Sequence, residues 1–73
     1  SPKEKRMRTK DQVSKEAADI IVRYADAADS QDTLEDARWS YLLAKNEMNS
    51  QDAFRALSAV EAATRRVHPL TRA

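Results

Sequence analysis

Few side chains in this sequence have the type and spacing that chemistry needs. The single histidine, His68, directly precedes Pro69 near the end of the chain, which is a poor position for holding a general base within reach of a substrate. The sequence contains no glycine and no cysteine, which excludes a glycine-rich phosphate loop and thiolate chemistry. We therefore expect a non-enzymatic protein with no catalytic residue, no cofactor and no small-molecule substrate.

A group of acidic residues in the middle of the chain is the one candidate for a cation site. These residues lack the ligand spacing and the turn glycine of a calcium loop, and a lone histidine cannot build a zinc site without carboxylates from elsewhere. We interpret the group as loop residues and helix caps, and we expect no metal. Its members are Asp26, Asp29, Asp32, Glu35 and Asp36.

Charge divides the sequence into three parts, although the whole chain carries only +1. Residues 1–10 have five basic and one acidic side chain, residues 11–52 have four basic and ten acidic, and residues 53–73 have four basic and one acidic. The acidic middle could face a basic protein surface, whereas the basic ends could neutralise phosphates without reading sequence. The nucleic-acid alternative uses Lys3, Lys5, Arg6, Arg8 and Lys10, together with Arg55 and Arg66, which share one helix face.

The elements that must position these residues are helices. Proline occurs only at positions 2 and 69, no stretch alternates with period two, and strong helix formers dominate. We expect an all-α fold: a small three-helix bundle over residues 11–68, mostly antiparallel, with helices at about 11–28, 33–47 and 51–67. Flexible basic termini flank it, a basic arm at 1–10 and a tail at 69–73. The expected capping signals are Thr9 with Gln12, Asp32 with Glu35, and Ser50.

Helical spacing predicts which side chains are buried. In the first helix they are Val13, Ala17, Ile20, Ile21, Tyr24 and Ala28. In the third they are Ala53, Ala56, Leu57, Val60, Ala63 and Val67.

The second predicted helix has apolar residues on two faces. Trp39 and Leu43 lie almost opposite the face that holds Leu34, Ala37, Tyr41, Ala44 and Met48. Either this helix touches both neighbours and Trp39 belongs to the core, or Trp39 and Leu43 form an exposed patch for a partner. Trp is a frequent anchor at interfaces. The candidate partner-binding residues are Trp39, Leu43, Asp36, Val22 and Asp26.

Residues 43–57 loosely resemble a helix-turn-helix. Met48 stands where that turn usually has glycine, and Asp52 would meet phosphates unfavourably at the start of the reading helix. The pattern therefore argues against this motif.

We predict from the sequence that the chain is a non-enzymatic helical protein-interaction module. It would be a small regulator, inhibitor or accessory factor, of the kind that a virus or plasmid encodes, which binds a protein partner and associates with itself as a homodimer. The alternative is a small nucleic-acid-binding protein. No apolar run approaches 18 residues and no signal segment is visible, so we expect a cytoplasmic location without a membrane partner.

Overall fold

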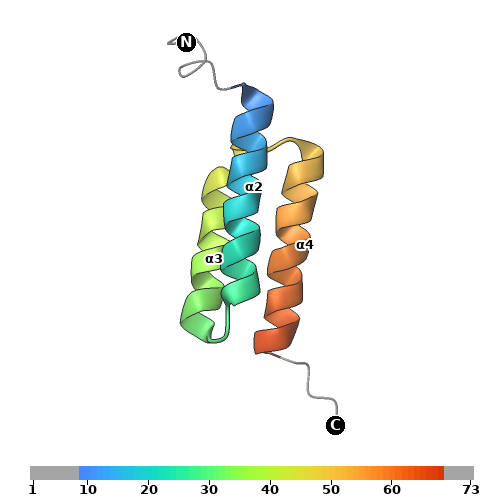
Figure 1. The fold of residues 1–73 in the computed structure, drawn as a ribbon. Coiled ribbons are helices and arrows are strands. Elements are labelled where there is room, and N and C mark those ends of the chain that lie inside the picture. The colour runs from blue at the N-terminus through green and yellow to red at the C-terminus, as the bar shows by residue number, and fades with distance from the viewer. Residues whose placement is uncertain (1–8, 69–73) are drawn as a thin grey trace.

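The computed structural model describes residues 9–68, which form three helices packed against one another (Figure 1). Helix α2 spans Lys10–Ala27, α3 spans Gln31–Ala44, and α4 spans Ser50–Val67, with a short 3-10 turn, η1, at Lys45–Glu47. The expected all-α three-helix fold is confirmed. The candidate residues Lys3, Lys5, Arg6 and Arg8, and the tail at 69–73, lie outside the described residues.

Figure 1 shows how the helices run. The chain descends through α2, returns through α3 and descends again through α4, so α3 is antiparallel to both neighbours while α2 and α4 are parallel. A helix-turn-helix would cross its two helices at about 90–120°. The side-by-side, antiparallel packing of α3 and α4 has another geometry, in agreement with the sequence-based argument against that motif.

Side-chain capping fixes where each helix begins. At the start of α2, the Thr9 hydroxyl accepts from the Gln12 N–H and the Gln12 side chain accepts from the Thr9 N–H, each at 3.0 Å. This reciprocal pair is the predicted capping box. It satisfies two amides, those of Thr9 and Gln12, that have no partner within the helix.

The caps of α3 and α4 differ from the prediction. Ser30 caps α3 in a reciprocal arrangement with Thr33, so the expected Asp32–Glu35 box was wrong and α3 begins earlier, at Gln31. Asn49 caps α4 by accepting from the Asp52 N–H at 2.8 Å, one residue before the expected Ser50. In both places several adjacent polar residues are of the types that can cap a helix, so residue type alone does not determine which one does.

The core consists mainly of alanine. Among the buried apolar residues, only Ile21 and Leu34 are large and almost completely enclosed. Alanine allows the helix axes to approach closely, but each alanine buries little area. The remaining members of the core are Ala18, Ala25, Ala28, Ala37, Met48, Ala56, Val60 and Ala63.

The buried stripe of α2 is rotated from the expected one. Ser14, Ala18, Ile21 and Ala25 are buried, whereas Ile20 and Tyr24, which we expected inside, are 46% and 51% exposed. Small residues at 14, 18 and 25 let α2 contact α3 and α4 at once, and this favours them over the bulkier neighbouring stripe. The expectation that Ile20 and Tyr24 belong to the core was wrong.

Arg66 of α4 caps the C-terminal end of α2. Its Nη2 lies 2.8 Å from the Ala25 carbonyl oxygen, 2.9 Å from that of Ala28 and 3.3 Å from that of Asp26. The last carbonyls of a helix have no partner within it, and they attract positive charge. Because the chain has no glycine to close α2 in a left-handed turn, a side chain from another helix satisfies them.

Within residues 9–68, none of the helices combines the length and the apolar character that crossing a membrane requires.

Candidate functional site

The described residues expose more large apolar side chains than they bury. The core holds four residues larger than alanine, Ile21, Leu34, Met48 and Val60, while six large apolar side chains are at least 46% exposed. Single exposed apolar residues are ordinary, but a contiguous group marks a contact surface. The six are Ile20, Tyr24, Trp39, Leu42, Leu43 and Phe54.

Four of these side chains belong to neighbouring faces of α2 and α3. Ile20 and Tyr24 lie one helical turn apart on α2, and Trp39 and Leu43, at 58% and 77% exposure, lie one turn apart on α3. We call these four residues the α2/α3 face. The sequence left open whether Trp39 is core or surface, and the structure places it at the surface.

An open groove of about 530 Å³ runs along this face. Tyr24 of α2 lines it together with Trp39 and Leu43 of α3, and Asp36 of α3 is the acidic residue of the lining. Small residues, Ala27, Thr33 and Ser40, form the rest of the lining. The groove thus brings together three predicted partner-binding residues, Trp39, Leu43 and Asp36, and adds Tyr24, which the sequence reasoning had assigned to the core.

The other two predicted partner-binding residues lie elsewhere. Val22 is half-buried and Asp26 is exposed, and both continue the row of α2 that starts at Asp19. Asp19 forms an ion pair with Arg55 of α4 at 2.9 Å, and Arg66 of α4 contacts the Asp26 carbonyl. This row therefore follows the α2–α4 side, and the structure does not bring it together with Trp39.

A second groove, of about 540 Å³, lies between α3 and α4. Tyr41, Leu42, Leu57 and Val60 supply its apolar lining, with Thr64 beside them, and Arg38, Glu61 and Arg65 contribute charged side chains of both signs. This groove has fewer exposed large apolar side chains than the α2/α3 face. Of the six large exposed apolar side chains, Leu42 is the one that lines it.

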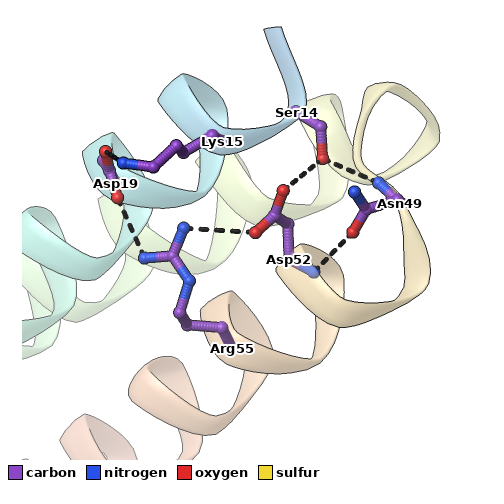
Figure 2. A network of polar contacts seen from close by, with 6 residues as sticks. All are labelled: Ser14, Lys15, Asp19, Asn49, Asp52 and Arg55. Carbon is purple, nitrogen blue, oxygen red and sulfur yellow. Dashed lines mark hydrogen bonds and ion pairs between the residues drawn. The ribbon is translucent and has the colours of Figure 1, made fainter. Parts of the chain in front are cut away.

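A polar network ties the start of α4 to the first half of α2 (Figure 2). The buried Ser14 hydroxyl donates to Asp52 Oδ2 at 2.6 Å and accepts from the Asn49 N–H at 2.8 Å. Arg55 donates to Asp19 at 2.9 Å and to Asp52 at 3.3 Å, and Lys15 adds a longer ion pair with Asp19 at 3.9 Å. Sequence patterns gave no sign of Ser14, because one serine on a helix has no distinctive spacing.

Hydrogen bonding in this network shifts the acidity of Asp52. The Ser14 hydroxyl is the largest influence that lowers the pKa of the Asp52 carboxyl below its ordinary value, and the Arg55 guanidinium lowers it further, while desolvation opposes both. Bonds to the charged form favour that form. The Ser14 hydroxyl thus joins Asp52 on α4 and the Asn49 N–H before α4 to α2, while the one histidine, His68, hydrogen-bonds to Gln31 and does not contact this serine. The arrangement is therefore a structural tie between α2 and α4.

Two of the three described basic residues of the nucleic-acid alternative, Arg55 and Arg66, are engaged within the molecule. Arg55 is bound to two carboxylates, and Arg66 caps α2. Contact with a phosphate would compete with these bonds. Lys10 is exposed and lies beside Val13, Asn46 and Glu47 in a small hollow at the start of α2.

In the part of the chain that the structure describes, no three histidine or acidic side chains lie close enough together to hold a metal ion.

Comparison with known proteins gives no match to a family model, to a curated protein or to a solved structure. The function must therefore be inferred from the surface itself.

Proposed function

We propose that this chain is a non-enzymatic protein-interaction module that binds its protein partner through the α2/α3 face. One observation carries the proposal: large apolar side chains are gathered on this face while the core beneath is mostly alanine. Burying Ile20, Tyr24, Trp39 and Leu43 against a partner would be favourable in proportion to the apolar area that it removes from water.

The composition of the face suits protein binding. Interfaces are enriched in Trp and Tyr, which cluster near the centre in partly enclosed pockets. Here Trp39 and Tyr24 line one groove from two different helices, and the rigid helices fix their relative position. A partner would therefore meet a prearranged surface and would lose little free energy in ordering it.

The acidic character of residues 11–52 favours a partner with basic side chains around an apolar contact. Asp36 lies in the groove itself, and Asp32 lies one turn before it on α3. Such a module would act by covering a functional surface of its partner, as a small regulator, inhibitor or accessory factor does. Charge of this kind raises association rates and selects partners more than it adds affinity.

Photocrosslinking in cells that naturally contain the protein tests this proposal. The photoreactive amino acid p-benzoylphenylalanine replaces Leu43 on the α2/α3 face, and in a matched variant it replaces Asp26 on the α4 side of α2. We expect a discrete crosslinked protein from position 43 and much less of it from position 26. Absence of any crosslink at position 43, or equal yields from the two positions, would contradict the assignment of the face.

The nucleic-acid alternative stays a prediction. Arg55 and Arg66 are bound within the bundle, Lys10 alone among the described candidates is exposed without such a contact, and the other candidates lie outside the described residues, so we do not prefer this alternative. It requires binding that weakens steeply as salt rises and that depends on residues 1–10. A filter-binding titration at low salt, with and without that segment, measures both.

A further inference from the structure

The exposed area of the α2/α3 face is close to what a small dimer needs. The exposed parts of Ile20, Tyr24, Trp39 and Leu43 amount to roughly 500 Å². A standard interface buries about 800 Å² on each partner, with an apolar centre and a polar rim. Polar residues that flank the four side chains would supply the remaining area.

Charges of opposite sign flank the two halves of this face. Asp36 lines the groove on α3. Arg23 of α2 is exposed, and it lies three residues after Ile20 and four before Ala27, which places it in the same row of the helix. Neither side chain has an ion-pair partner among residues 9–68. Tyr24 and Ala27 of α2 line the groove alongside Thr33 and Asp36 of α3. Arg23, which precedes Tyr24, therefore lies at about the same height along the bundle axis as Asp36.

We propose that the α2/α3 face pairs with the same face of a second copy, so that α2 of one copy packs on α3 of the other. A two-fold axis parallel to the helices generates this arrangement and keeps the facing helices antiparallel. Ile20 then meets Trp39 and Leu43 of the second copy. Arg23 comes to the level of Asp36 of the second copy, and symmetry repeats each contact. The inference rests on the proposed function and names the partner of the same face: a second copy, in which Arg23 is the basic side chain beside the apolar contact.

Charge reversal tests the pairing without disturbing the core. Arg23→Asp leaves acidic groups on both sides of the interface, and Asp36→Arg leaves basic groups on both sides. Each single variant should dimerise on the order of tenfold more weakly than the wild type, because two weak ion pairs become two repulsive pairs. An equimolar mixture of the two variants should form a dimer with one chain of each, since both pairs are then complementary again.

The measurement is sedimentation velocity from about 1 µM to 1 mM, with native mass spectrometry to identify the mixed dimer by mass. The fluorescence of Trp39, the only tryptophan, should shift to shorter wavelength as the dimer forms. The control is Arg65→Asp at the α3–α4 groove, which should leave the dimerisation constant unchanged. Circular dichroism verifies that every variant keeps its helix content.

Three results would overturn the inference: a wild-type protein that stays monomeric at 1 mM, a dimer that neither reversal weakens, or variants that fail to pair when mixed. A monomer whose position 43 crosslinks to a different polypeptide would end the self-pairing inference but leave the proposed function standing. A monomer without any crosslink from that position would end both.

Discussion

At the residue scale, two polar side chains connect helices, and the sequence pattern did not predict this role for either of them. Ser14 and Arg66 both connect α2 to α4, the first near the start of the helices and the second near their ends. Since α2 and α4 are parallel neighbours, these two contacts at opposite ends fix their register. An alanine-rich core has few interlocking side chains that could do this.

We expect Arg66→Ala to lower the free energy of unfolding by about 1–2 kcal/mol, because the charged hydrogen bonds from Arg66 to the carbonyls at the end of α2 are lost. The control is Arg65→Ala, since the Arg65 side chain is exposed and forms no hydrogen bond or ion pair among residues 9–68. It should change stability by less than about 0.5 kcal/mol. Urea denaturation measures both values, and equal effects would show that Arg66 does not cap α2.

Asp52 should make stability depend on pH in the acid range. Its pKa is lowered in the folded state by Ser14 and Arg55, so its contribution is fully present above the ordinary value of 3.8 and is lost as the pH falls through the lower folded value. Asp52→Asn should be less stable than the wild type near pH 6, and the difference should shrink below pH 3.8. Thermal melts of both proteins across this range measure it, and a difference that stays constant would contradict the shift.

At the scale of the element, α3 is the unusual helix. One face carries Leu34 and Ala37 into the core, while the other presents Trp39 and Leu43 to the solvent. A helix of a monomer normally keeps one apolar stripe and one polar face. The sequence pattern predicted this second apolar stripe of α3. In the structure, neither α2 nor α4 covers it.

The two faces of α3 should respond differently to the same substitution. Leu34→Ala removes a completely buried side chain and should destabilise the fold by about 2–4 kcal/mol. Leu43→Ala changes a side chain that is 77% exposed, so at low protein concentration its effect should stay below about 0.5 kcal/mol. Chemical denaturation at micromolar concentration compares them. A large loss from Leu43→Ala under these conditions would place Leu43 in the core of the monomer.

At the scale of the whole molecule, stability should depend on protein concentration. A dimer is stabilised by mass action, so the Tm should rise as the protein is concentrated. Trp39→Ala should remove this dependence and leave the Tm near that of the dilute wild-type protein. Phe54→Ala, at a residue of α4 that is 71% exposed and lies off the α2/α3 face, should keep it. Differential scanning calorimetry over a hundredfold concentration range measures the Tm of the wild type and of both variants.

Much of the fold could be predicted from the sequence by itself. Composition and spacing gave an all-α bundle, the Thr9–Gln12 capping box and the two apolar faces around Trp39, because these properties depend on residues within a turn or two of one another. The end of the third helix at Val67 followed from Pro69 for the same reason.

Only the tertiary structure decided which apolar faces are covered. Periodicity alone assigns Ile20 and Tyr24 to the core as strongly as it assigns Ile21. Close packing through Ser14, Ala18 and Ala25 nevertheless places the first two at the surface. The same packing places Tyr24 beside Trp39 and gives Arg66 its carbonyl partners. Contacts between residues forty positions apart depend on how three helices share one core, and no local spacing in the sequence encodes that geometry.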